Sequence, residues 1–268
     1  MVSPHRLALE DRKRAEFRRT RARQRTLPVQ TSPRRAHDLI RASIRLGLDG
    51  GQPFKAEHEL VRRMATSRNA LREALQMLAA QGLLSRRAGQ GTRVSAAIAP
   101  VSLDEAVPRG PGVMIHQLES HFVPATPVMR HQLRTDDEWI LMSEQLVEVN
   151  GEPLMLRVGY CPQSRVRDGL VRLIRTRAYP GAPVAEMFPR LFGVKLGTIE
   201  NTIEAVPCEE RSAGLLGIAV GAPVLVREML LRGVDGVPYL LIYAHHRGDR
   251  VALSDALPRT RPTAHAGS

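Results

Sequence analysis

Two arginines and an asparagine are the residues of this sequence best suited to contact another molecule. Arg68 and Arg72 are four residues apart and Asn69 follows Arg68, so a helix would present all three on one side. An α-helix fits the major groove of DNA, and arginine donates two hydrogen bonds to guanine O6 and N7. Ser67 is a natural cap for this helix, and a helix N-terminus with a hydroxyl can also bind a phosphate oxygen.

The same residues also admit a purely structural interpretation. Either Arg68 or Arg72 could form an ion pair with Glu57 or Glu73 and contact nothing outside the protein. The surrounding elements favour DNA contact, because base contacts cluster at the N-terminal end of a recognition helix.

Three helices and a hairpin are predicted around these side chains. Helices are expected at residues 36–46, 57–64 and 67–81, with glycines after the first and the third, and strands at 83–87 and 92–95. Their apolar residues recur at helical spacing: Ala36, Leu39, Ile40, Ile44, Leu60, Val61, Met64, Leu71, Ala74, Leu75 and Leu78. Three helices followed by a two-stranded hairpin form a winged helix-turn-helix, predicted for residues 34–95.

The loop of the hairpin and several polar side chains complete the candidate DNA-binding site. Glycine in this loop permits positive φ and a close approach to the DNA backbone or minor groove. The candidate DNA-binding residues are Arg35, Lys55, Glu57, His58, Ser67, Arg68, Asn69, Arg72, Gly89, Gln90, Gly91 and Thr92.

The positive charge of the chain is concentrated at its beginning. The net charge is +12, and residues 1–35 contain ten arginines and one lysine against three acidic residues. Residues 1–33 are expected to be a disordered arm that follows the phosphate backbone. The alternative is a solubilising or misassigned leader. Residues 256–268 are expected to be a flexible tail.

The remainder of the chain predicts a second domain of the α+β class. Residues 96–112 are rich in proline, glycine and alanine and are expected to be a linker. Beyond them, strand-like runs lie at 139–149, 153–160, 198–206, 224–231 and 238–243, and helices fit 184–192 and 209–216. Asn150-Gly151 is a strong hairpin signal. The elements show no regular βαβ repeat, which favours α+β for residues 113–255.

The sequence lacks the residues that several classes of protein function require. No nucleophile with a neighbouring base, paired carboxylates or phosphate-binding loop is identifiable, so no enzyme is expected. Cys161 and Cys208 lack metal-ligand spacing, and the adjacent His245 and His246 would face opposite sides of a strand, so we expect no metal or cofactor. No apolar run spans a membrane, and a cytoplasmic location is the simplest interpretation.

The N-terminal motifs resemble the winged helix of the GntR family. The segments that carry the resemblance are SRNALREAL and, in the hairpin region, LSRRAGQGTRV. Two departures are visible: Lys55-Ala56 replaces the usual Pro-Ser before the second helix, and His58 replaces an arginine that often contacts DNA. The resemblance implies a regulator that binds double-stranded DNA. The two departures imply that its operator sequence, or its affinity for the operator, differs from that of other family members.

Residues 113–255 are similar to the UTRA effector domain of the HutC branch of this family, which has a chorismate-lyase-like fold. The similar segments are NGEPLMLRVGYCP, AGLLGIAVGAPVLVREMLL and GVPYLLIYAHHRGDRVAL. The usual phosphate-binding arginines correspond to Gln145 and Val147, and a usual glutamate corresponds to Arg157, which weakens the case for a phosphosugar ligand. Arg157 could bind a carboxylate, although an exposed strand arginine is an equal alternative. The candidate effector-binding residues are Ser120, Gln145, Arg157, Tyr160 and Tyr243.

Together these features imply a transcriptional regulator controlled by a small molecule. The resemblance implies a homodimer joined through residues 113–255, and repression that is relieved by a sugar, amino acid or carboxylate. The linker at 96–112 would be the hinge. Tyr160 and Tyr243 could instead be core residues, and Arg247-Gly248-Asp249 is expected to fix a turn. The alternatives are a ligand-independent architectural DNA-binding protein and, less favoured, a lyase-like enzyme.

Overall fold

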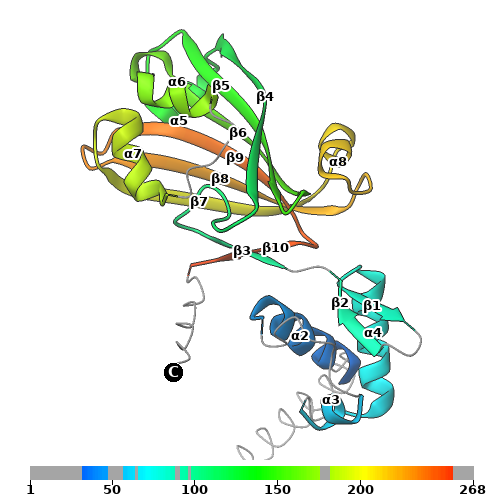
Figure 1. Ribbon diagram of the computed structural model, residues 1–268. Helices are drawn as coiled ribbons and strands as arrows, with labels where there is room; N and C mark the ends of the chain where they lie inside the picture. Colours follow the sequence, from blue (N-terminus) through cyan, green and yellow to red (C-terminus); the bar gives the residue numbers. More distant parts are fainter. Residues whose placement is uncertain are drawn as a thin grey trace, which may run out of the picture. The chain divides into compact units, whose positions relative to one another are not determined.

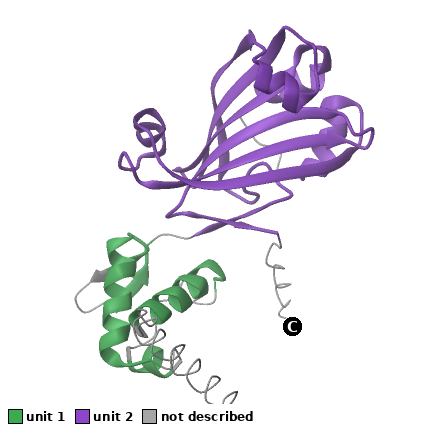
Figure 2. Ribbon diagram, turned by 180° about the vertical axis from the view of Figure 1, so that it is seen from behind, with its two compact units in different colours: residues 1–95 green, residues 96–268 purple. Residues whose placement is uncertain are grey.

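The computed structural model divides the chain into two compact units. The residues that the structure describes are 32–47, 57–63, 66–87, 91–95, 98–175 and 182–255. Unit 1 comprises residues 1–95 and unit 2 comprises residues 96–268 (Figure 2). Each unit buries apolar side chains of its own and therefore has its own core.

Unit 1 contains the predicted three helices and hairpin (Figure 1). Its elements are α2 (Ser32–Arg45), α3 (Glu57–Arg63), α4 (Arg68–Ala80), β1 (Leu84–Arg87) and β2 (Gly91–Val94). The strands pair as an antiparallel hairpin. The core is formed by the apolar residues with helical spacing, among them Ala36, Ile40, Ile44, Leu60, Leu71, Leu75 and Leu78. The predicted winged helix-turn-helix is therefore confirmed.

Both ends of α4 follow local signals in the sequence. Ser67 is in an extended conformation, and its Oγ accepts a hydrogen bond from the backbone N–H of Ala70 at 3.2 Å. This bond satisfies one of the N–H groups that a helix leaves unpaired at its start. After the last turn, Gly82 has a φ of 69°, which a residue with a side chain rarely adopts. The predicted cap and the predicted stop are both confirmed.

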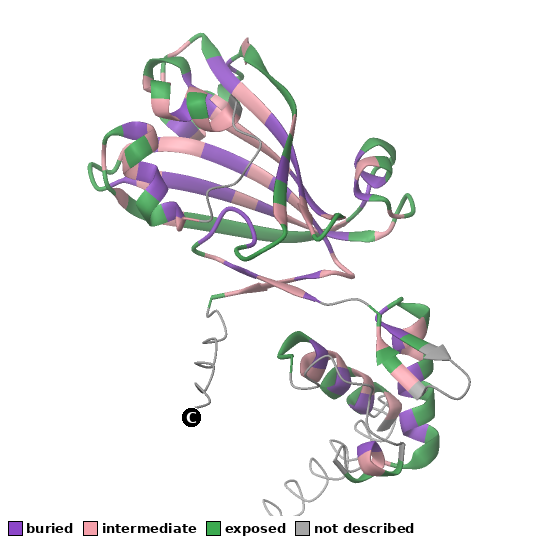
Figure 3. Ribbon diagram, viewed as in Figure 1, coloured by how far each residue is buried: buried purple, intermediate pink, exposed green. Residues whose placement is uncertain are grey.

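Unit 2 is built on a six-stranded sheet in which neighbouring strands are antiparallel (Figure 1). From one edge to the other the strands are β4 (Val113–Pro124), β5 (Trp139–Val149), β6 (Glu152–Pro162), β9 (Pro238–Arg247), β8 (Pro223–Gly233) and β7 (Leu196–Pro207). The predicted hairpin turn joins β5 to β6, with φ values of 54° at Asn150 and 79° at Gly151. The edge strand β7 is exposed along most of its length (Figure 3).

Helices cover both faces of this sheet. They are α5 (Pro127–Leu133), α6 (Asp168–Arg175), α7 (Val184–Phe192) and α8 (Glu210–Leu216), with a short 3₁₀ helix η1 (Gln163–Arg165) after β6. One core cluster joins α6 and α7 to the sheet, and includes Leu141, Cys161, Leu170, Phe188, Met229 and Ile242. Two other clusters join α5 and α8 to the opposite face, and include Leu133 with Ile140, and Leu216 with Leu146. We call these the α6/α7 face and the α5/α8 face.

The segment 96–112, predicted to be a linker, differs from that expectation. Residues 99–102 form strand β3 (Ala99–Ser102), which pairs in parallel with β10 (Val251–Ser254). Val101 and Val107 are fully buried. Proline, glycine and alanine made this segment resemble a connector, but its valines pack against residues that are distant in the sequence. Most of it is therefore part of unit 2 and is not a free hinge.

The α+β class of unit 2 is confirmed, and the sequence predicted five of the six strands and the helices α7 and α8. The sequence analysis predicted none of β3, β4, β10, α5 and α6. No helix in the described part of the chain is long and apolar enough to cross a membrane.

Candidate functional sites

Helix α4 presents a polar face to the surroundings of unit 1. Arg68, Asn69, Arg72 and Gln76 are exposed, whereas Ala70, Leu71, Ala74, Leu75 and Leu78 are buried on the other side. The apolar side packs into the core, so the orientation of the helix leaves the polar side outward. This arrangement allows side chains to enter a groove of DNA.

The arginines of this face are available for contact with another molecule. Among the described residues, the side chains of Arg68 and Arg72 form no hydrogen bond and no ion pair. The alternative in which one of them pairs with Glu73 is therefore not found, and the side chain of Glu57 lies outside the described residues. Two guanidinium groups and a carboxamide on one helix face match the donor and acceptor groups of the major groove.

The remaining predicted DNA-binding residues are distributed over the other elements of unit 1. Arg35 is exposed on α2, His58 is exposed on α3 and Thr92 is half-buried on β2. Lys55, Gly89 and Gln90 lie outside the described residues, as do the side chain of Glu57 and almost all of the arm 1–33. Gly91 is the first residue of β2.

A contact that sequence reasoning missed ties α2 to the end of α4. The side chain of Gln81, directly after α4, accepts a hydrogen bond from Arg41 Nη1 at 3.3 Å through its Oε1. His37 Nε2 lies 3.1 Å from Gln81 Nε2. These polar contacts add to the apolar packing that fixes the direction of α4.

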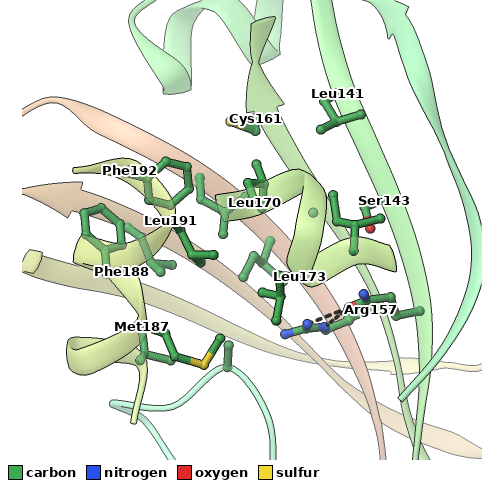
Figure 4. Close-up of a pocket in the computed structure, with 18 residues that line it drawn as sticks. Leu141, Ser143, Arg157, Cys161, Leu170, Leu173, Met187, Phe188, Leu191 and Phe192 are labelled. Carbon is green, nitrogen blue, oxygen red and sulfur yellow. Dashed lines mark hydrogen bonds between the residues drawn. The ribbon is translucent and has the colours of Figure 1, made fainter. Parts of the chain in front are cut away.

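In unit 2, a cavity of about 90 Å³ lies between the α6/α7 face of the sheet and helices α6 and α7 (Figure 4). Its lining residues are Ala106, Leu141, Ser143, Gln145, Arg157, Gly159, Cys161, Leu170, Leu173, Ile174, Val184, Met187, Phe188, Leu191, Phe192, Leu231, Leu240 and Ile242. The lining residues of β5, β6 and β9 are two apart along each strand, because every second side chain of a strand points to the same face. Leucine, isoleucine, phenylalanine and methionine make up most of the lining, so the described wall is mainly apolar.

The polar end of this pocket is a hydrogen-bonded row across three strands. Arg157 donates from Nε and Nη2 to Gln145 Oε1 at 2.8 and 2.5 Å. Gln145 Nε2 donates to Gln117 Oε1 at 2.8 Å, and Gln117 Nε2 donates to Ser143 Oγ at 3.1 Å. The row follows the strand register, in which Gln117 pairs with Gln145 and Gln145 with Arg157. It fixes the orientation of the Arg157 guanidinium in the pocket wall.

The predicted effector residues do not all lie in this pocket. Gln145 and Arg157 line it, whereas Ser120 is exposed on β4, where it pairs with Ser143 and is not among the lining residues. Tyr160 and Tyr243 lie on the opposite, α5/α8 face, with their ring centroids 6.3 Å apart in an edge-to-face arrangement. Grouping Tyr160 with Arg157 is inconsistent with strand geometry, since residues three apart point to opposite faces.

The two tyrosines pack against the core cluster around α5. Burial raises the pKa of Tyr243 to about 12, so its hydroxyl is protonated at neutral pH and donates to Gln132 Oε1 at 3.3 Å. The sheet separates both rings from the pocket, so one small ligand cannot contact Tyr243 and Arg157 together.

Sequence reasoning missed a buried carboxylate that contacts the start of α7. Glu105 is 5% exposed, and its Oε2 accepts the backbone N–H of Val184 at 3.0 Å. Its Oε1 lies 3.4 Å from Arg109 Nε. Val184 and the neighbouring Ala106 both line the pocket. The segment that follows β3 is therefore bonded directly to a pocket helix.

The same segment is anchored to the sheet by Arg227 of β8, which is fully buried. Arg227 Nη1 donates to the carbonyl oxygens of Ser102 at 3.2 Å and Glu105 at 2.8 Å, and Nη2 donates to that of Leu103. Its Nε donates to Asn201 Oδ1 at 2.8 Å. Burial lowers the pKa of Arg227 to about 10, so it remains charged at neutral pH. An arginine inside the apolar run VLVREMLL was the available sequence signal.

At the end of β9, the structure agrees with the predicted turn at Arg247–Asp249 and with the predicted opposite orientations of His245 and His246. Arg247 Nη2 donates to Asp249 Oδ2 at 2.8 Å, and Nη1 donates to Pro153 O at 3.1 Å, so this motif fixes a turn. His245 is half-buried and His246 fully buried, on opposite faces of the strand. No group of three or more histidine, cysteine or acidic residues is placed to hold a metal in the described ranges.

Comparison with known proteins gives the same division of the chain. Residues 34–94 match the model of the gntR family of bacterial regulatory proteins, and residues 112–252 match that of the UTRA domain. The chain belongs to the GntR family. As a GntR-family chain with a UTRA domain it is a transcriptional regulator, and the resemblance seen in the sequence is confirmed.

Relatives of this GntR-family chain are similar over most of its length. It is 32% identical to the HTH-type transcriptional regulator Rv0792c of Mycobacterium tuberculosis, over 89% of this chain and 90% of that protein. It is 24% identical to the probable fructoselysine utilization operon transcriptional repressor of Escherichia coli K12, over 84% and 98%. The crystal structure of PhnF from Mycobacterium smegmatis has a TM-score of 0.54 at 22% identity, over 82% and 99%, and supports the fold.

Proposed function

We propose that this regulator is a repressor of the HutC branch, and that a small molecule bound in the pocket beneath α6 and α7 controls its affinity for operator DNA. The observation that carries the DNA-binding part is the exposed row Arg68, Asn69 and Arg72 on α4. The name of the E. coli relative supports repression. The regulator acts in the cytoplasm on double-stranded DNA and catalyses no reaction.

The substitution Arg72→Ala tests the DNA-reading face. The DNA is a duplex selected by the wild-type protein from a random library. One bidentate arginine–guanine pair contributes about 1–3 kcal/mol, so we expect affinity in a gel-shift titration to fall about 5- to 150-fold. Stability should change by less than about 0.5 kcal/mol, because the side chain is exposed and has no partner among the described residues.

The matched control is Arg130→Ala, which removes the same charge from an exposed helical position of α5 in unit 2. It should leave the affinity for the selected duplex unchanged. Equal losses from the two variants would mean that Arg72 acts only through net charge, and an unchanged affinity of Arg72→Ala would refute its placement at the bases.

The basic arm at residues 1–33 is proposed to contact the DNA phosphates. Its concentration of arginine is the support for this assignment. Deleting residues 1–30 should weaken binding to all sequences and reduce the slope of log affinity against log salt concentration, because fewer counterions are released. An unchanged slope would show that the arm is not on the phosphates.

We further propose that the pocket communicates with the chain leading to unit 1 through Glu105. A ligand that contacts Val184 would alter the position of α7, whose first N–H is bonded to Glu105. Glu105 lies three residues after β3, and β3 is the first strand of unit 2 along the chain. A ligand changes the affinity for DNA only if it binds two conformations of the protein with different affinities. We propose that the two conformations differ in the position of α7.

The regulator is proposed to act as a homodimer joined through unit 2, since two recognition helices would match a pseudo-palindromic site. Edge strand β4 supports this assembly, because it carries the exposed apolar side chains Met114, Leu118 and Phe122. Sedimentation equilibrium of the full chain tests whether the protein is a dimer. A monomer at micromolar concentration would contradict the proposed homodimer.

A further inference from the structure

A second cleft, of about 400 Å³, lies on the α5/α8 face of the sheet, between the end of α5 and the strands β7 and β8. A volume of this size is typical of sites that take a small organic molecule. Its lining residues are His131, Gln132, Arg134, Glu200, Asn201, Thr202, Glu228, Leu230 and Arg232. All of them except Leu230 are polar, in contrast to the mainly apolar pocket beneath α6 and α7. A matching ligand is therefore polar, with a bonding group for each charged side chain that it desolvates.

One end of the cleft carries a negative charge that no cation neutralises in the described part of the chain. Glu228 Oε1 accepts a hydrogen bond from Gln132 Nε2 at 3.0 Å, and the hydroxyl of Tyr243 lies within hydrogen-bonding reach of the same carboxylate. Both of these neighbours are uncharged. A carboxylate has about four positions at which it accepts a hydrogen bond, so Glu228 can still accept from a ligand ammonium group.

The other end of the cleft carries an excess of positive charge. Arg232 Nε donates to Glu200 Oε1 at 2.6 Å, while its Nη1 is buried and has no hydrogen-bond partner among the described residues. The bond to Arg232 lowers the pKa of Glu200, and the nearby charge of Arg134 adds to this effect. Within the described ranges, the exposed side chain of Arg134 forms no hydrogen bond and no ion pair. Two arginines and one glutamate leave a net charge of +1 at this end, which matches the single charge of a carboxylate.

The geometry of β8 separates the two charged ends. Glu228 and Arg232 are four residues apart on this strand and line the same cleft, so their Cα atoms are about 13 Å apart at about 3.3 Å per residue. A ligand that lies between these side chains, in hydrogen-bonding contact with each, has its own charges about 7–10 Å apart. An extended dipeptide or tripeptide has this length, since each residue adds at most about 3.5 Å. A free α-amino acid is too short to reach both ends.

We propose that this cleft binds a linear zwitterion of the length of a dipeptide or tripeptide, with its ammonium group at Glu228 and its carboxylate at Arg134 and Arg232. Thr202, opposite Glu228 on β7, offers its hydroxyl to the peptide group between the charged ends. The cleft is separate from the proposed effector pocket, because the sheet lies between the α5/α8 face and the α6/α7 face. The regulator would therefore have a second ligand site, beyond its proposed function.

Isothermal titration calorimetry of the full-length protein tests the proposal with triglycine and three related probes. Glycine has the same charged groups at a shorter separation, N-acetyltriglycine lacks the ammonium charge, and triglycine amide lacks the carboxylate. We expect triglycine to bind at least about tenfold more tightly than each of the other three, because triglycine alone supplies a partner for both ends of the cleft. Equal affinity for triglycine and any of these probes, or no binding of triglycine at about 10 mM, would overturn the proposal.

Two variants locate the charged ends of the ligand. Arg134→Gln should lose at least about fivefold in affinity for triglycine and show little change for triglycine amide. Glu228→Gln should lose a similar factor for triglycine and show little change for N-acetyltriglycine. The matched controls are Arg130→Gln on α5 and Glu204→Gln on β7, which remove the same charges from exposed positions outside the cleft. Both controls should bind triglycine normally.

The pattern of losses decides the assignment. An equal loss in a variant and in its control would mean that the affinity follows net charge alone, which would refute the site. Unchanged affinity in Arg134→Gln would refute the placement of the carboxylate. This variant remains decisive if Glu228→Gln does not fold, because Arg134 is exposed and its side chain has no partner in the described ranges.

Discussion

Replacing Glu105 by glutamine should weaken the junction between the segment after β3 and the start of α7. The carboxylate is buried, accepts the N–H of Val184 at 3.0 Å and lies 3.4 Å from Arg109 Nε. Glutamine has the same size and keeps one acceptor oxygen. The variant therefore removes the negative charge and little else.

The expected loss follows from the contacts of that charge. A hydrogen bond to a charged group contributes about 1.5–3 kcal/mol and a neutral one about 0.5–1.5 kcal/mol. A negative charge at a helix N-terminus adds about 0.3–1 kcal/mol. The partly exposed pair with Arg109 adds at most about 1 kcal/mol. Burying a neutral amide is less unfavourable than burying a carboxylate, which offsets part of the loss. We expect the free energy of unfolding of unit 2 to fall by about 1–2 kcal/mol.

Urea unfolding followed by the fluorescence of Trp139 measures this change. Trp139 is the only tryptophan of the chain and lies on β5 in unit 2. The matched control is Glu186→Gln, because Glu186 lies in the first turn of the same helix but is exposed. It should lose less than about 0.5 kcal/mol, from the helix dipole alone.

Hydrogen exchange at the amide of Val184 gives a local readout. Exchange should accelerate in Glu105→Gln and remain unchanged in Glu186→Gln. Equal destabilisation by the two variants, or unchanged exchange at Val184, would refute the assignment of this bond. Glu105→Gln also tests the proposed route from the pocket. The variant should keep the wild-type affinity for DNA in the absence of ligand, but a bound ligand should change that affinity less than in the wild-type protein.

Two further substitutions test how local geometry supports the two sites. Ser67→Ala removes the cap of α4 and should lower the stability of unit 1 by about 1 kcal/mol, measured by circular dichroism during urea unfolding; no change would mean that the cap is dispensable. Gly169→Ala should destabilise unit 2 by more than about 1 kcal/mol, because the added Cβ would lie 2.2 Å from the carbonyl oxygen of Arg190. Its control, Gly214→Ala in α8, has no neighbour within 4 Å and should be neutral or stabilising; equal effects would contradict the close contact of α6 with α7.

The sequence by itself determined the architecture of unit 1 and which side of α4 is exposed and polar. The apolar spacing of Ala36, Ile40 and Ile44, the cap at Ser67 and the stop at Gly82 are short-range signals, and each acts within one or two helical turns. Because the apolar side of α4 packs into the core, the opposite side of the helix must be exposed. The hairpin turn at Asn150-Gly151 was predictable for the same reason.

Strand alternation in the sequence also predicts on which face of the sheet a residue of β6 lies. Arg157 and Tyr160 are three residues apart on one strand, so they point to opposite faces. The spacing of the two residues therefore places Tyr160 on the face opposite Arg157.

The pocket and its connection to β3 were decided only by the tertiary structure. The Arg227 side chain binds carbonyl groups 122 to 125 residues earlier in the chain, and Glu105 binds an amide 79 residues later. Such contacts leave no periodic pattern, because each depends on which strands become neighbours in the sheet. The composition of residues 96–112 therefore indicated a linker, whereas the long-range burial of Val101 and Val107 made most of it part of unit 2.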